Sequence, residues 1–134
     1  MPSKIAKLRH QAFIRQDGRC YYCDRPMCSG DLEQFAERLK SSLRFARRYL
    51  CTAEHLLPVQ DGGKDTAENI VAACAFCNAT RHRFMCPPTP EAYRRHVASR
   101  IRRGKWHPQL LLNRSQSSSR SSKVTLANVP NRQV

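Results

Sequence analysis

Long apolar runs are missing from this 134-residue chain. Residues 1–10 contain no apolar stretch that would serve as the core of a signal peptide. No later segment approaches the roughly 18 consecutive apolar residues that a membrane-spanning helix needs. We therefore expect a soluble, cytoplasmic protein whose length suits a single domain.

Acidic residues are scarce. The chain has 10 Asp and Glu against 24 Lys and Arg, which gives a formal net charge of +14. A positive charge of this size attracts polyanions, and the repulsion among the basic side chains opposes compaction of the chain. General solubility or a membrane surface would also account for the charge alone, but the metal-type residues described below favour nucleic acid, either DNA or RNA, as the partner.

Disulfide bonds are also not expected, because cysteines of a protein in a reducing compartment are more often metal ligands or free thiols. In addition, seven cysteines cannot form a closed set of internal bridges. This argues against a secreted, disulfide-rich basic toxin. Two pairs share the Cys-x-x-Cys spacing, and four thiolates complete the closed tetrahedral shell of a structural zinc ion. The alternative of four unrelated buried cysteines does not explain the identical spacing. The predicted ligands are Cys20, Cys23, Cys74 and Cys77, whereas Cys28, Cys51 and Cys86 are interpreted as core or free thiols.

The periodicity of apolar residues predicts a short basic helix, a long helix and a helix near the end of the folded part. The first covers residues 4–16 and ends before Gly18, and the second covers residues 31–50. The third begins after Thr89, which is suited to cap it, and stops at Gly104. Between the second and third helices we predict a strand in residues 51–60, a turn at residues 61–63, a short strand within residues 66–74, and a helix over residues 75–83. The expected fold class is α+β.

The last part of the chain has a different composition. From residue 113 onward Ser, Arg, Asn and Gln dominate, without sustained apolar periodicity. Ordering such a segment costs entropy that little burial offsets. We therefore predict a folded domain over residues 1–112 and a disordered basic tail over residues 113–134.

Several unusual residues occur in order between the two cysteine pairs. Residues 54–63 read Glu-His-Leu-Leu-Pro-Val-Gln-Asp-Gly-Gly, Asn69 follows, and Asn78 stands directly after the second pair. This series, over residues 20–83, resembles the HNH endonuclease family. In that family an acidic residue and His are followed by Pro, a Gly-containing loop, an Asn, and Cys-x-x-Cys with His or Asn after it. The resemblance implies a bacterial or phage-type enzyme with a small ββα-metal core. The cysteine spacing adds a four-cysteine zinc site that staples this core and makes residues 31–50 an insertion, and the periodicity adds a helix over residues 90–103.

Phosphodiester hydrolysis gives these residues distinct tasks. The reaction needs an activated water and neutralisation of charge at the phosphate and the leaving oxygen. Glu54 and Asn78 offer oxygen ligands, which suit Mg²⁺ or Mn²⁺, so they are the candidate ligands of the catalytic metal. Histidine accepts a proton near neutral pH, and His55 is the candidate general base.

The resemblance implies the same division of roles. It assigns activation of water to His55 and metal binding to Glu54 and Asn78, and it makes Asn69 an orienter of the loop that carries the histidine. It also implies products with 5′-phosphate and 3′-hydroxyl ends. Two departures are present: Glu54 stands where Asp is commoner, and Asn78 stands where His gives the family its last letter, so the chain has an HNN pattern.

For other basic and aromatic residues, the sequence indicates a function less specifically than for the HNH-like motif. Four are candidate phosphate contacts, with a solvated basic face as the alternative: Arg81, His82, Arg94 and Arg95. Trp106 is expected to pack, and three histidines lack a motif and are interpreted as surface or core residues: His10, His96 and His107. The sequence thus predicts a metal-dependent DNA endonuclease. The alternative is a non-catalytic zinc module that binds nucleic acid.

Overall fold

The computed structural model describes residues 1–112 and 124–126. Within this part of the chain no helix has both the length and the apolar character that crossing a membrane requires. The elements, in chain order, are α1 (Lys4–Arg15), α2 (Leu32–Leu39), α3 (Leu43–Ala46), the 3-10 helix η1 (Arg47–Tyr49), β1 (Cys51–His55), the 3-10 helix η2 (Val59–Asp61), β2 (Ile70–Cys74), α4 (Ala75–Arg81), α5 (Pro90–Arg102), β3 (Leu110–Leu112) and β4 (Val124–Leu126).

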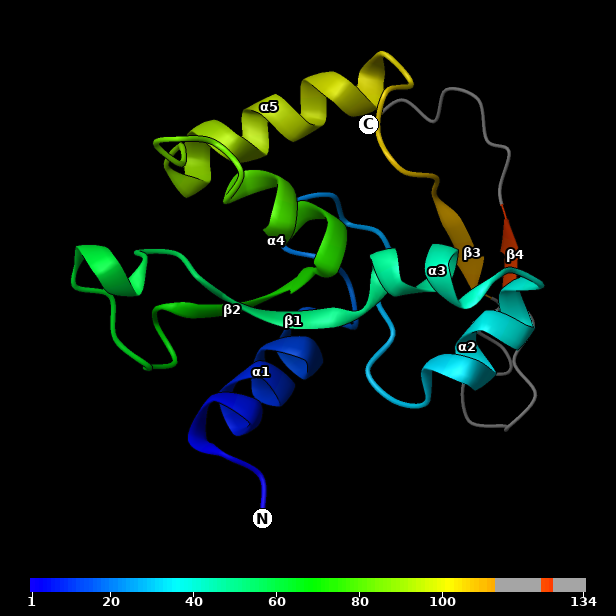
Figure 1. The fold of residues 1–134 in the computed structure, drawn as a ribbon, viewed down its shortest axis with the longest axis horizontal. Coiled ribbons are helices and arrows are strands. Elements are labelled where there is room, and N and C mark those ends of the chain that lie inside the picture. The colour runs from blue at the N-terminus through cyan, green and yellow to red at the C-terminus, as the bar shows by residue number, and fades with distance from the viewer. Residues whose placement is uncertain (113–123, 127–134) are drawn as a thin grey trace.

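A two-stranded hairpin and the helix that follows it form the centre of the fold. Strands β1 and β2 pair antiparallel, with Cys51 opposite Cys74 and His55 opposite Ile70. Helix α1 packs against one face of the hairpin, α4 lies on the other face, and α5 covers α4 (Figure 1). The predicted order of strand, loop, strand and helix is confirmed, as is the α+β class.

The first and last predicted helices are confirmed by their caps. In α1 the Ser3 hydroxyl accepts a hydrogen bond from the Ala6 amide, and Gly18 follows the helix with φ +72°. In α5 Thr89 caps the N-terminus and Pro90 is the first helical residue. Gly104 follows α5 with φ +68°, a conformation in which glycine avoids the steric cost that other residues meet.

The helix predicted over residues 31–50 is wrong as a single element. It consists of α2, α3 and η1, and the break lies at Lys40, which has a left-handed backbone with φ 55°. Two serines follow, and the Ser42 hydroxyl accepts a hydrogen bond from the Phe45 amide, which starts a new helix. Serine side chains compete with helical backbone hydrogen bonds, so this pair ends one helix and caps the next despite the continuous apolar periodicity.

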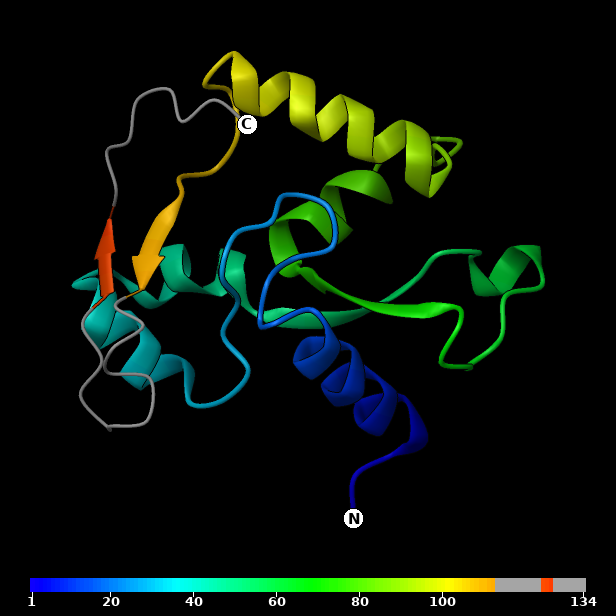
Figure 2. The ribbon, with the colours of Figure 1, turned by 180° about the vertical axis from the view of Figure 1, so that it is seen from behind.

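Two hydrophobic clusters stabilise the fold. The first surrounds the four cysteines between α1, the hairpin and α5, and includes Ala12, Tyr93 and Val97. The second joins α2, α3 and η1 to the start of β3, and includes Phe35 and Leu110. Seen from behind, α2, α3, β3 and β4 gather at the end of the hairpin away from the β1–β2 loop (Figure 2).

Residues 113–123 and 127–134, in which the disordered tail was predicted, lie outside the described residues. The prediction is wrong for Val124–Leu126, because these residues form β4 and pair antiparallel with β3. This pairing crosses the domain boundary expected at residue 112. A segment of three strand residues within a polar stretch has too little periodicity to be recognised from sequence.

Candidate active site and metal centre

The two Cys-x-x-Cys pairs meet in one buried cluster. Cys20 and Cys23 lie in the turn after α1, Cys74 ends β2, and Cys77 lies in the first turn of α4. All four Sγ atoms lie within 4.8 Å of one another, and the Cys23 and Cys74 Sγ atoms are 3.9 Å apart. A tetrahedron of sulfurs with metal–sulfur bonds of about 2.3 Å has edges of about 3.8 Å. The cluster can therefore hold a metal such as zinc, as the spacing predicted.

The thiols of this cluster influence one another. Burial is the largest effect on the Cys20 thiol and acts to raise its pKa, but hydrogen bonds from Cys23, Cys74 and Cys77 together outweigh it and lower the pKa. Burial raises the pKa of Cys23 and Cys77. One thiolate is thus stabilised by its neighbours, and thiolates are the form that binds metal.

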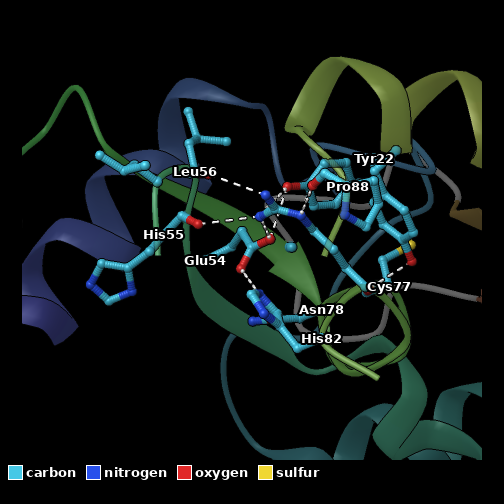
Figure 3. Close-up of polar contacts among 12 residues, drawn as sticks. Tyr22, Glu54, His55, Leu56, Cys77, Asn78, His82 and Pro88 are labelled. Atoms are coloured by element: carbon cyan, nitrogen blue, oxygen red, sulfur yellow. Dashed lines mark hydrogen bonds and ion pairs between the residues drawn. The ribbon is translucent and has the colours of Figure 1, made fainter. Parts of the chain in front are cut away.

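Glu54 is the buried acid of the site. It lies on β1 with 1% of its surface exposed. Its Oε2 accepts hydrogen bonds from Arg81 Nη1 at 2.7 Å and from the Tyr22 hydroxyl at 2.8 Å, while Oε1 lies 3.0 Å from His82 Nε2 (Figure 3). Burial, and then the charge of Glu54, raise the pKa of Tyr22, so this phenol remains a donor. Oε2 therefore already accepts two hydrogen bonds from buried side chains, whereas Oε1 faces His82, whose side chain is more exposed.

Asn78 lies on α4, and His82, which caps the C-terminus of this helix, lies one turn further along on the same side. The Asn78 Nδ2 donates to Thr52 Oγ1 at 3.0 Å and to the Ala53 carbonyl at 3.4 Å. Among the described residues, Asn78 Oδ1 accepts no hydrogen bond. The side chain of His82 is 36% exposed. An acid oxygen, an imidazole nitrogen and an amide oxygen thus lie where β1 meets α4.

His55 is the residue after Glu54, and its ring points away from the Glu54 carboxylate (Figure 3). Consecutive residues of a strand face opposite sides, which accounts for this separation. The Nε2 atom lies 2.8 Å from Asp65 Oδ1, and the His55 side chain is 22% exposed. The imidazole is therefore held by one carboxylate and accessible to solvent.

Asn69 ties the loop after His55 to the start of β2. Its Oδ1 accepts from the Leu57 amide at 2.8 Å, and its Nδ2 donates to the carbonyls of Leu57 at 3.0 Å and Lys64 at 3.1 Å. The loop is so tight at Gly63 that a Cβ there would lie 1.7 Å from the Leu57 carbonyl oxygen. These contacts fix the backbone that carries His55.

Comparison with known proteins identifies this unit. The family model for HNH endonuclease matches residues 40–84. This segment is therefore similar to HNH endonucleases. It contains β1, the tight loop, β2 and α4, and with them Glu54, His55, Asn69 and Asn78. No curated protein and no solved structure matches the chain.

Arg81 departs from the role predicted for it within the HNH segment. We expected it to contact the scissile phosphate, but the residue is 1% exposed. Besides its ion pair with Glu54, its guanidinium donates to the carbonyls of His55 at 3.3 Å, Leu56 at 3.2 Å and Pro88 at 3.0 Å. A buried charge requires such partners, and Arg81 uses its donors on the protein itself. The phosphate-binding prediction for Arg81 is therefore wrong.

We expect Arg81→Ala to lower the free energy of unfolding by about 3–5 kcal/mol, because it would leave the Glu54 carboxylate buried without its cation. Urea denaturation of zinc-loaded protein measures this loss. The matched control is Arg83→Ala, two residues along and exposed, which we expect to change stability by about 0.5 kcal/mol or less. Equal midpoints for the two variants would contradict a stabilising role for this ion pair.

Sequence reasoning assigned His82 to phosphate binding, and the structure instead places its Nε2 beside Glu54 Oε1. The spacing of four residues from Asn78 was the signal that could have indicated this. Tyr22 was missed, because nothing in a Cys-x-x-Cys turn predicts a contact with a carboxylate 32 residues away. Arg94 and Arg95 are exposed on α5, with the Arg94 guanidinium 4.5 Å from the Tyr21 ring centroid, and their phosphate binding stays a prediction.

Proposed function

We propose that this protein is a metal-dependent endonuclease that hydrolyses phosphodiester bonds in DNA. The observation that carries the proposal is the 3.0 Å approach of Glu54 Oε1 to His82 Nε2, next to Asn78 and one residue from an accessible histidine. A carboxylate, an imidazole and an amide from one strand and one helix form a set of donors for a divalent cation.

The donor geometry fits a hard divalent cation. Adjacent ligands in an octahedral shell with bonds of 2.0–2.1 Å lie about 3 Å apart, and Glu54 Oε1 and His82 Nε2 are 3.0 Å apart. Asn78 Oδ1 is the third candidate donor. We therefore extend the ligand set from Glu54 and Asn78 to include His82. When bound, Mg²⁺ or Mn²⁺ supplies charge neutralisation at the phosphate and at the leaving oxygen.

His55 serves as the general base in this proposal. The Asp65 carboxylate accepts from Nε2–H, which leaves Nδ1 as the atom that takes a proton from water. Asn69 is a positioning residue, because its three hydrogen bonds hold the loop that begins after His55 and carries Asp65. Arg81 positions Glu54 by pairing its permanent positive charge with the buried carboxylate.

The sulfur cluster has a different role. Four cysteines complete a tetrahedral shell and leave no open position for substrate, which is the arrangement of a structural zinc site. Zinc bound there would join the turn after α1 to the β2–α4 junction, and so would hold α4, which carries Asn78 and ends before His82. The two metals are separated by donor type, with sulfur for zinc and oxygen and nitrogen for the catalytic ion.

DNA is the proposed substrate because of the net charge of +14. Arg94, Arg95 and other basic residues are expected to contact phosphates, so binding should depend strongly on salt and little on the base sequence. RNA is the alternative substrate. Products with 5′-phosphate and 3′-hydroxyl ends are proposed from the family. A non-catalytic nucleic-acid-binding zinc module would share the sulfur cluster and the charge, but it gives no role to the donors around Glu54.

Cleavage of supercoiled plasmid tests the proposal. Protein freed of loosely bound metal by gel filtration is expected to cut only after Mg²⁺ or Mn²⁺ is added. His82→Ala is expected to raise the metal concentration for half-maximal cleavage about tenfold or more, since it removes one of three protein ligands. The matched control is His10→Ala, exposed on α1, with an unchanged metal requirement.

Each outcome of this titration has a clear meaning. An equal metal requirement in both variants would remove His82 from the metal site. Binding of plasmid without cleavage in any divalent metal would favour the non-catalytic module over the nuclease.

A further inference from the structure

His107 lies beside the sulfur cluster, although it is far from both cysteine pairs in sequence. It follows α5 and is 3% exposed. Its Nε2 atom is 3.5 Å from Cys23 Sγ and 3.6 Å from Cys74 Sγ, so the imidazole edge faces two of the four sulfurs. The four cysteines supply all four ligands that a tetrahedral zinc shell needs, so the histidine would contact the ligands from outside the shell.

Aromatic rings hold the imidazole in this orientation. The rings of Tyr49 and Phe76 stack on it with centroid distances of 4.6 Å each and interplanar angles of 20° and 24°. Arg25 Nε donates to the His107 carbonyl at 3.2 Å, which fixes the backbone as well. The ring has little freedom to turn away from the sulfurs.

The location of the proton follows from the environment. Nδ1 is buried and has no hydrogen-bond partner among the described residues. A proton on Nδ1 alone would bury an N–H group without an acceptor while Nε2 turned a lone pair toward two sulfurs, and both arrangements are unfavourable. A proton on Nε2 instead gives a donor directed at Cys23 and Cys74.

We propose that His107 is a positioning residue of the metal centre, whose Nε2–H donates to the thiolates of Cys23 and Cys74. Donation withdraws negative charge from a buried cluster of four thiolates and orients two of them toward the metal. The same contact joins the segment between α5 and β3 to the cluster, so metal binding also orders that connection. Outer partners of metal ligands commonly alter metal affinity about 10- to 100-fold.

Competition for zinc against a colorimetric chelator tests the inference on the full chain. His107→Phe retains a ring between Tyr49 and Phe76 but cannot donate, and we expect zinc affinity to fall about 10- to 100-fold. His107→Gln retains an N–H donor and is expected to recover at least part of the affinity. His96→Phe is the control on α5, exposed and stacked on Tyr93 but without a sulfur contact, and should leave affinity unchanged.

Three results from the zinc titrations and NMR spectra would overturn the inference. These are zinc affinity in His107→Phe equal to that of the unmodified protein, equal loss in the Phe and Gln variants, or an Nδ1-protonated tautomer of His107 in ¹⁵N NMR spectra of the unmodified zinc-loaded protein. Cobalt-substituted protein gives a further check. The thiolate-to-cobalt absorption is expected to indicate four sulfurs, and a nitrogen ligand lost on His107 substitution would show direct ligation instead.

Because the inference rests on the proposed zinc at this cluster, zinc stoichiometry of the unmodified protein is measured first. Protein that binds no zinc would reject the metal centre itself. Zinc binding that is insensitive to His107 would reject only the role of the histidine.

Discussion

His55→Ala is expected to lower the rate of DNA cleavage by about 10²- to 10⁴-fold, the usual contribution of a general base. The effect arises because the alanine variant has no group at this position to take a proton from the attacking water. His55 is partly exposed, and its described side-chain partner is the 46% exposed Asp65, so the loss of stability should be about 1 kcal/mol or less. The measurement is a single-turnover rate with saturating DNA and metal.

The controls separate catalysis from folding and binding. His55→Ala should melt near the temperature of the unmodified protein and bind DNA with unchanged affinity and salt dependence, and His10→Ala should cleave at the normal rate. An unchanged rate in His55→Ala would remove the imidazole from the mechanism. A loss of rate accompanied by an equal loss of folded protein would assign His55 a structural role.

The parts of the fold that sequence predicted are those set by local pattern. The apolar pair Ile70-Val71, the Gly62-Gly63 turn and the helix-compatible residues after Cys74 predicted the hairpin and α4 in the right order. Thr89 and Gly104 marked both ends of α5. Helix caps and turns are local signals, because each residue acts on backbone only a few positions away.

Contacts between distant segments were the parts that sequence did not predict. The Tyr22 hydroxyl reaches Glu54 across 32 residues, and His107 reaches Cys23 across 84 residues. No periodicity encodes such pairings. The role of Arg81 was missed for a related reason: arginine is usually exposed, and only the buried carboxylate from another element explains why this one is not.

The candidate site was therefore predicted by its residue types more completely than by its geometry. Glu54, Asn78 and the four cysteines were selected for the chemistry of their donor atoms, and the structure brings the cysteines together. For Glu54, the structure adds that Arg81 and Tyr22 hold one carboxylate oxygen, whereas the other lies beside His82. This asymmetry depends on burial, which the motif does not specify.

Cys74→Ser is expected to unfold or aggregate the protein. Structural zinc contributes about 10–16 kcal/mol of apparent binding free energy, comparable to or greater than the roughly 5–15 kcal/mol by which whole domains are stable. Cys74 is 0% exposed and also caps α4, where its Sγ accepts from the Cys77 amide at 3.4 Å. Serine is a favoured N-cap residue, so the substitution retains a capping group and mainly removes a thiolate ligand.

Thermal melting and zinc content measure this effect together. Cys86→Ser is the matched control, because Cys86 is exposed and lies outside the cluster, and it should keep one zinc ion and a normal melt. Asn78→Ala should also stay folded and retain zinc, but cleave slowly, since its Oδ1 is proposed to bind only the catalytic metal. The opposite order, with a stable Cys74→Ser protein and an unfolded Asn78→Ala protein, would exchange the structural and catalytic assignments of the two sites.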